Sequence, residues 1–135
     1  MISSLVVDTD VISFVFKGDT RADLYQPHLA NKLLIVSFMT IAELDRWVLQ
    51  RGWGEARRTK LEKFLHQYIT SFSDRALCWK WAEAVLGSRR NGRPIRTADG
   101  WVAATALLHQ IPLVTNNRSH YVGIDGLTLT SALML

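Results

Sequence analysis

Residues 5–10 read Leu5-Val6-Val7-Asp8-Thr9-Asp10, a short apolar run that ends at an acidic residue. Consecutive apolar residues bounded by polar ones are typical of a buried strand. Asp8, Thr9 and Asp10 are residue types that cap helices, so we expect a helix over Val11–Phe16 directly after the strand. This segment therefore predicts the opening strand–helix unit of an α/β domain.

The rest of the chain continues this alternation. Leu33–Val36 is a second fully apolar run, and helical spacing follows it over Phe38–Gln50. Such alternation predicts a single domain over residues 1–135, with a mainly parallel central sheet flanked by helices. The remaining helices are expected at 22–30, at 55–66, from a cap at Ser73 to about Arg89, and at 98–109 after a cap at Thr97; the remaining strands are expected at 68–72, 111–115 and, at an edge, 127–129.

Composition limits where the protein can act. No apolar run approaches the roughly 20 residues needed to cross a bilayer, and the N-terminal segment lacks the basic region of a signal peptide. Cys78 is the only cysteine, which excludes an internal disulfide and a thiolate zinc site. We therefore expect a cytoplasmic protein with no membrane association.

The charge of +4 is unevenly distributed along the chain. Residues 1–45 hold six acids and three bases, whereas residues 46–135 hold six acids and 13 bases. A basic region suits a polyanionic partner, although charge alone fits an ordinary solvated surface equally well. The densest basic stretch, 88–96, carries four side chains suited to gripping phosphates, unless it is a solvated loop: Arg89, Arg90, Arg93 and Arg96.

Three acids occupy corresponding places in the expected topology. Asp8 follows the first strand, Glu43 lies in the helix after the second, and Asp99 begins the helix before the strand at 111–115. Because carboxyl ends of parallel strands share one edge of the sheet, these side chains should converge there. Crowded carboxylates repel one another, and a bound Mg²⁺ or Mn²⁺ relieves that repulsion while readying water for attack on a phosphate. Each acid alone could be a cap, a solvated residue or a helix-dipole acid; together they favour a metal site.

Two tryptophans are candidates for nucleic-acid or partner contacts. Trp53 lies between Gly52 and Gly54 and is expected to be an exposed aromatic. Trp101 is close to Asp99, where a core position is favoured over stacking on a base.

Four short motifs together resemble those of PIN-domain ribonucleases, specifically the VapC-type toxins of bacterial toxin–antitoxin pairs. They are Val6-Val7-Asp8-Thr9-Asp10, Ser37-Phe38-Met39-Thr40-Ile41-Ala42-Glu43-Leu44, Thr97-Ala98-Asp99 with the helix that follows, and Leu113-Val114-Thr115-Asn116-Asn117. The resemblance implies a metal-dependent endoribonuclease that forms a homodimer and is inhibited by a VapB-like antitoxin.

The resemblance also implies roles for individual residues. Asp8, Glu43 and Asp99 correspond to the family's metal ligands, Asn117 to its polar residue after the strand, and Thr9 or Thr115 to a supporting hydroxyl. Two positions depart from the pattern. Asp10 stands where the family usually has asparagine, and could add or replace a ligand. His120 stands where many members have a fourth acid; it could orient water, contact RNA, hold a softer metal such as Mn²⁺, or be a surface residue.

Two other functions fit parts of the sequence. Asp8-Thr9-Asp10-Val11 resembles the opening of a HAD-like phosphatase with Asp8 as nucleophile, but that family needs a later lysine, and none follows Thr115. A non-catalytic RNA-binding module on the same fold is the other alternative, since fold alone does not fix function.

Overall fold

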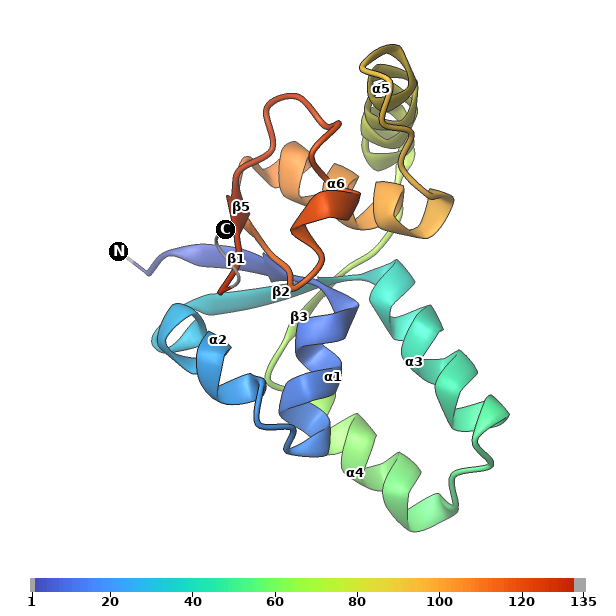
Figure 1. Cartoon of the computed structure of the whole chain (residues 1–135). Coiled ribbons are helices and arrows are strands. Elements are labelled where there is room, and N and C mark those ends of the chain that lie inside the picture. Colours follow the sequence, from blue (N-terminus) through green and yellow to red (C-terminus); the bar gives the residue numbers. More distant parts are fainter. Residues whose placement is uncertain (1, 133–135) are drawn as a thin grey trace.

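A five-stranded parallel sheet forms the centre of the molecule, and helices cover both of its faces (Figure 1). The computed structural model describes residues 2–132. The strand order is β3-β2-β1-β4-β5. The strands are β1 (Ser4–Val7), β2 (Leu33–Ser37), β3 (Ile69–Ser71), β4 (Leu113–Val114) and β5 (Leu129–Thr130). This confirms the α/β class and the parallel sheet expected from the sequence.

Alternating side chains of the strands divide the core into two. Leu5 and Val7 of β1 join one buried cluster, and Val6 between them joins the other. Because successive strand residues point to opposite faces, a strand buried on both faces needs an unbroken apolar run. The pattern that predicted β1 is thus the one that fills both cores.

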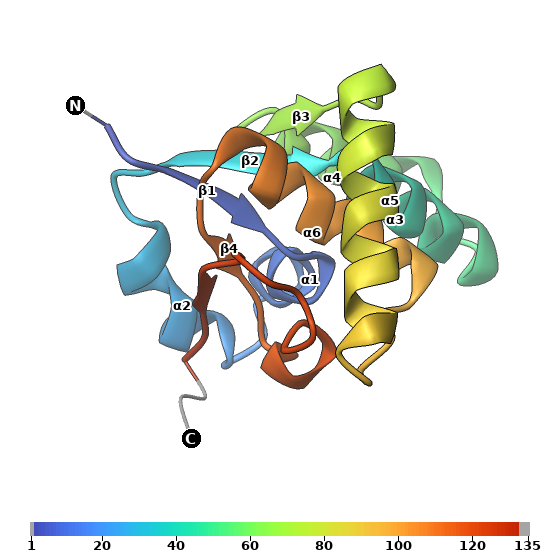
Figure 2. The same ribbon diagram turned by 90° about the horizontal axis from the view of Figure 1, so that it is seen from above.

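Within residues 2–132, six α-helices cover the two faces of the sheet. Helices α1 (Thr9–Lys17), α2 (Ala22–Leu29), α3 (Phe38–Gln50) and α4 (Glu55–Leu65) pack on one side, and α5 (Arg75–Arg90) and α6 (Thr97–His109) on the other (Figures 1 and 2). No helix within residues 2–132 is long and apolar enough to span a membrane.

Helix starts differ from the sequence expectations at three places. Helix α1 begins two residues early because the Asp8 carboxylate accepts the Thr9 N–H. Asp74, not Ser73, caps α5 by accepting the Leu77 N–H. Thr97 is the first residue of α6 rather than its cap, and the preceding Arg96 makes no side-chain capping bond.

Strand ends differ because backbone pairing is shorter than the apolar runs. The expected strand at 111–115 forms ladder pairs only at Leu113 and Val114, since Pro112 has no N–H to donate. The last strand lies at 129–130 instead of 127–129, although at the sheet edge as expected. Trp53 is half-buried rather than exposed, and its ring lies 5.9 Å from that of Phe16.

Candidate metal centre

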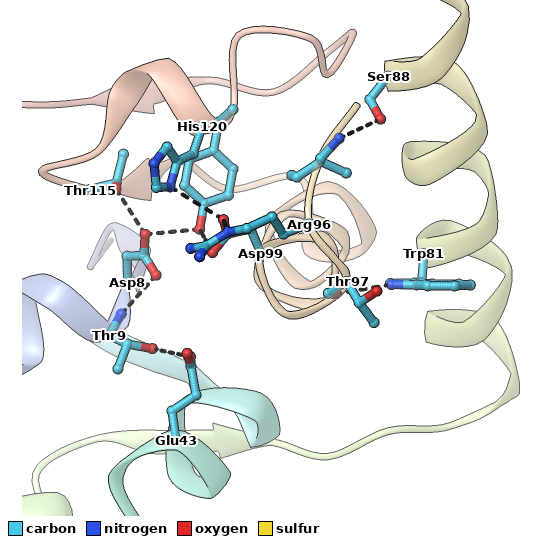
Figure 3. A network of polar contacts seen from close by, with 12 residues as sticks. Asp8, Thr9, Glu43, Trp81, Ser88, Arg96, Thr97, Asp99, Thr115 and His120 are labelled. Atoms are coloured by element: carbon cyan, nitrogen blue, oxygen red, sulfur yellow. Dashed lines mark hydrogen bonds and ion pairs between the residues drawn. The ribbon is translucent and has the colours of Figure 1, made fainter. Parts of the chain in front are cut away.

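Asp8 lies at the carboxyl end of β1, where it is fixed from both main chain and side chain. Its N–H donates to the Val114 carbonyl of β4 at 2.9 Å. One carboxylate oxygen, Oδ1, accepts the Thr9 N–H at 2.8 Å. The other, Oδ2, accepts the Thr115 hydroxyl at 2.8 Å (Figure 3) and the Tyr121 hydroxyl at 2.8 Å. Three donors from three segments therefore orient one carboxylate.

Asp99, in the first turn of α6, faces Asp8 across a short gap. The Tyr121 hydroxyl lies 3.5 Å from Asp99 Oδ1, so a single phenol oxygen separates the two carboxylates. Arg96 Nε and His120 Nδ1 approach Asp99 Oδ2 at 3.1 and 3.3 Å (Figure 3). Both acids are buried, with 6% and 8% of their surface exposed.

Glu43 joins the site through a chain of hydroxyls. The Thr9 hydroxyl donates to Glu43 Oε1 at 2.8 Å (Figure 3). It also lies 2.9 Å from the Thr40 hydroxyl. Since the Thr9 hydrogen is given to Glu43, Thr40 must donate to Thr9. Helix α3 carries both Thr40 and Glu43, and it begins at a cap formed by Ser37 at the end of β2.

Asp10 lies beside Asp8 in the first turn of α1. Its two carboxylate oxygens accept the N–H groups of Val11 at 2.7 Å and Asn116 at 3.1 Å. The Asn116 side chain is in turn held by the Tyr25 hydroxyl at 2.7 Å. The Asp10 side chain is therefore fixed by hydrogen bonds next to Asp8 and is not a free, solvated carboxylate.

Burial and crowding raise the pKa values of two of these acids. Desolvation by burial raises the pKa of Asp8 from 3.8 to about 6, with the charge of Asp99 adding to it and the hydrogen bonds of Thr115, Tyr121 and Thr9 opposing it. Burial, followed by the charge of Asp8, raises the pKa of Asp10 to about 7. The pKa of Tyr121 is also raised by burial and then by Asp8, so its hydroxyl remains a donor. A bound cation would reverse this penalty on the carboxylates.

The donor set fits a hard divalent cation. No three His, Cys, Asp or Glu side chains among residues 2–132 are arranged to hold a metal ion together. The predicted triad is accordingly not a closed cage: Tyr121 links Asp8 and Asp99, whereas Glu43 is reached through Thr9. Mg²⁺ typically takes one or two protein carboxylates and completes its shell with water and phosphate oxygens, which is what an open all-oxygen pair can offer.

A groove of about 480 Å³ opens beside Asp99. Arg93, Arg96, Ser119 and His120 contribute its polar lining. Next to the groove, the Asn91 side chain donates to the Gly123 carbonyl at 2.9 Å and so links the end of α5 to the segment after Tyr121. A Cβ on Gly123 would lie 2.5 Å from the Arg93 carbonyl oxygen, so glycine permits this close approach.

The structure brings some of the predicted site residues close to the acids and leaves others apart from them. Thr9 and Thr115 donate hydrogen bonds to the acids, and His120 Nδ1 lies 3.3 Å from Asp99. The Asp10 carboxylate accepts the N–H groups of Val11 and Asn116. Asn117 is exposed, and its N–H donates to the Thr115 hydroxyl at 3.0 Å. Arg89 and Arg90 are exposed at the end of α5 and do not line the groove. Tyr121, Thr40 and Asn116 were not anticipated; the signal for Tyr121 was a phenol four residues after Asn117, which alone could not be distinguished from an ordinary core tyrosine.

Fold and site together define an α/β domain with a carboxylate centre at the carboxyl edge of a parallel sheet. The chain belongs to the PIN domain family, whose sequence model matches residues 5–122. This sets aside the HAD-like phosphatase alternative. Divalent-metal dependence is general among the VapC ribonucleases of this family.

Named relatives match over most of this chain. It is 27% identical to "Ribonuclease VapC1" of Haemophilus influenzae over 127 residues, which cover 90% of this chain and 92% of the relative. It is also 27% identical over 131 residues to "VapC ribonuclease Y4jK" of Sinorhizobium fredii, covering 90% and 94%.

Solved structures share the fold. FitAcB from Neisseria gonorrhoeae superposes with a TM-score of 0.82 at 22% identity, covering 97% of this chain and 99% of the other. VapBC-1 from nontypeable Haemophilus influenzae gives 0.80 at 24% identity, covering 96% and 98%. VapBC2 from Rickettsia felis, bound to a promoter DNA fragment, gives 0.81 at 21% identity, covering 95% and 98%.

Proposed function

We propose that this protein is a metal-dependent endoribonuclease that acts as the toxin of a toxin–antitoxin pair. The observation that carries the proposal is the meeting of Asp8 and Asp99 around one hydroxyl at the carboxyl edge of the sheet, with Glu43 one threonine away. Two relatives that match nine-tenths of this chain are named ribonucleases, which supports RNA as the substrate. We propose the cytoplasm as its place of action, in keeping with an RNA substrate.

Each acid has a distinct part in hydrolysis of a phosphodiester. Asp8 and Asp99 would hold Mg²⁺ or Mn²⁺, and Asp10, held beside Asp8, would add to the negative field that attracts the cation. When bound there, such a cation would polarise the phosphate and make water easier to deprotonate. Glu43, half-buried and oriented by Thr9, is the carboxylate best placed to accept a proton from the attacking water. Thr115 holds Asp8 in position, and Asn117 in turn holds Thr115.

Arginines beside the acids provide the grip on RNA. Arg93 and Arg96 line the groove next to Asp99, and Arg89 and Arg90 extend the basic surface to the end of α5. Guanidinium groups suit phosphate oxygens because they present several donors in a fixed plane. His120 lines the same groove and contacts Asp99, so it can orient water or a phosphate oxygen there.

The regulatory partner is a VapB-like antitoxin. Solved structures with TM-scores of 0.80 to 0.82 are VapBC and FitAcB complexes, which supports a partner of that kind for this fold. A homodimer is the expected assembly of the toxin, and we propose that residues 1–135 act as one domain within it. Light scattering of the purified protein, alone and with its antitoxin, measures both associations.

The test is cleavage of total cellular RNA by antitoxin-free protein with Mg²⁺, with Mn²⁺ and with EDTA. We expect discrete fragments with either metal and none in EDTA. Asp99→Asn should lose cleavage by at least about 100-fold because it removes a ligand charge. Asp74→Asn is the matched control: it makes the same chemical change at the cap of α5, where asparagine also caps well.

The non-catalytic alternative makes the opposite prediction. A binding module would shift RNA in gel-shift assays and cleave nothing with either metal. Its RNA affinity would be the same in the parent protein and in the Asp99→Asn variant. That result, from protein shown to be folded, would overturn the nuclease proposal.

A further inference from the structure

Tyr121 is a buried tyrosine whose ring contacts apolar side chains and whose hydroxyl contacts two carboxylates. Its ring belongs to the apolar cluster beneath α5 and α6, which includes Val6, Val102 and Leu113, and only 1% of the residue is exposed. It follows the short 3₁₀ turn η1 (Arg118–His120), so it reaches the site from a segment outside the sheet. The ring is thus anchored by packing, and the hydroxyl is delivered to the acids.

The hydroxyl hydrogen has one principal acceptor. Asp8 Oδ2 lies 2.8 Å from the phenol oxygen, an ordinary hydrogen-bond length, whereas Asp99 Oδ1 lies at 3.5 Å. Because a phenol carries a single hydrogen, it is committed to Asp8 and stands as a spacer toward Asp99.

We propose that Tyr121 is a positioning residue that orients Asp8 and sets its separation from Asp99 for the divalent cation. The inference rests on the proposed function in taking those two acids as ligands. Asp8 Oδ2 already accepts two hydrogen bonds, from Thr115 and Tyr121, and Oδ1 accepts one from the main chain. Each carboxylate oxygen has about two acceptor sites, so Oδ1 is left with the free site for a metal.

The hydroxyl has a role that the ring cannot perform. In Tyr121→Phe the ring keeps its apolar neighbours, but Asp8 Oδ2 loses a donor and no polar atom remains between the two carboxylates. Partners that orient metal ligands typically contribute 10-fold to 100-fold in metal affinity or activity. A purely packing residue would lose none of this in the phenylalanine variant.

The experiment measures Mn²⁺ binding by electron paramagnetic resonance and calorimetry, without RNA, for the parent and Tyr121→Phe. Binding should be about 10-fold to 100-fold weaker in the variant. RNA cleavage should need correspondingly more Mn²⁺ and recover as Mn²⁺ approaches saturation. Thermal unfolding of each protein first fixes a temperature at which both are folded. Tyr68→Phe is the matched control, because Tyr68 is also buried but lies in the other apolar cluster, after α4.

The outcomes separate this inference from the nuclease proposal. If the parent cleaves RNA and Tyr121→Phe matches it in Mn²⁺ affinity and cleavage, the nuclease stands and the positioning role is overturned. If neither protein cleaves RNA but the variant alone binds Mn²⁺ more weakly, the positioning role stands and the nuclease falls. Equal weakening by Tyr68→Phe, or no Mn²⁺ binding by the parent, overturns the positioning role.

Discussion

The Asp8 carboxylate shows how one residue can serve both fold and site. It caps α1 through Oδ1 and receives two hydroxyls at Oδ2, so its orientation is over-determined before any cation binds. This preorganisation is balanced by burial close to Asp99 and Asp10, which penalises the ionised form.

That penalty makes the stability of the metal-free protein depend on pH. The pKa values of Asp8 and Asp10 are raised from 3.8 to about 6 and about 7, so the folded state holds these protons more tightly than the unfolded chain. Their contribution to stability is complete below pH 3.8 and is lost as pH rises through about 6 and 7. We therefore expect the free energy of unfolding in EDTA to fall between about pH 4 and pH 7 and to level off above that, measured by urea titration.

Substitution of Asp10, which has the higher of the two pKa values, isolates its contribution to the pH dependence of stability. Asp10→Asn should flatten the upper part of this decline, from about pH 6 to pH 7, because the group that titrates there is gone. Asp19, whose pKa is lowered to about 2 by Arg21, stays ionised throughout this range and serves as the control position. An unchanged pH profile in Asp10→Asn would contradict the assignment. Addition of Mg²⁺ at pH 8 should restore stability in the parent.

At the scale of elements, the start of α6 depends on how closely α5 packs against it. Trp81 of α5 donates to the Thr97 carbonyl at 3.3 Å, and its ring stacks on that of Trp101 with centroids 5.1 Å apart. Gly100 permits this contact, since a Cβ there would lie 2.9 Å from Trp81 Nε1. The same first turn of α6 carries Asp99.

We expect Gly100→Ala to destabilise the protein by about 1–3 kcal/mol, because Trp81 or α6 must move to admit the methyl group. The displacement should also lower RNA cleavage, since Asp99 is the adjacent residue. Gly87→Ala is the matched control: Gly87 also lies within a helix, α5, but nothing lies within 4 Å of its added Cβ. Alanine there should raise stability by about 0.5–1 kcal/mol. Urea unfolding of both variants gives the comparison. Equal stability of Gly100→Ala and Gly87→Ala would show that the contact at Gly100 has room for a methyl group.

The sequence predicted elements better than it predicted their contacts. β1, β2 and the helices that follow them were recognisable because each needs only a local pattern, such as the run Leu5–Val7 buried on both faces. Tyr121 and Thr40 could not be assigned, because their contacts join residues 113 and 31 positions apart and depend on helix rotation and loop path. The predicted exposure of Trp53 was wrong for a similar reason. Its flanking glycines suggested an exposed side chain, whereas its ring packs against that of Phe16 in α1.

At the scale of the whole molecule, charge is arranged around a single edge of the sheet. The acids collect at the carboxyl ends of the strands, and the groove beside them is lined by Arg93 and Arg96. Within a net charge of +4, this places an anion-binding surface next to a cation-binding centre. RNA phosphates would then be held by arginine on one side and by the bound metal on the other.

Salt dependence of RNA binding tests that arrangement. Removal of one phosphate contact from a single strand should reduce the slope of log affinity against log salt by about 0.7. We expect this for Arg93→Gln, measured by fluorescence anisotropy with a labelled RNA in EDTA so that no cleavage occurs. Arg58→Gln, at an exposed position of α4 away from the groove, should leave the slope unchanged. Equal effects at both positions would indicate diffuse attraction instead of a defined RNA path.

The hydrogen bond between Asp8 and Tyr121 spans 113 residues, and this has a consequence for the protein during its own synthesis. A ribosome adds about 5–20 residues per second, so Tyr121 exists only on the order of ten seconds after Asp8 has been made. For almost all of that time Asp8 lacks two of its three donors, Thr115 and Tyr121, and the segment that carries His120 to Asp99 is absent. A nascent chain attached to messenger RNA therefore carries an unfinished centre for most of translation, and its full complement of partners arrives only near the end.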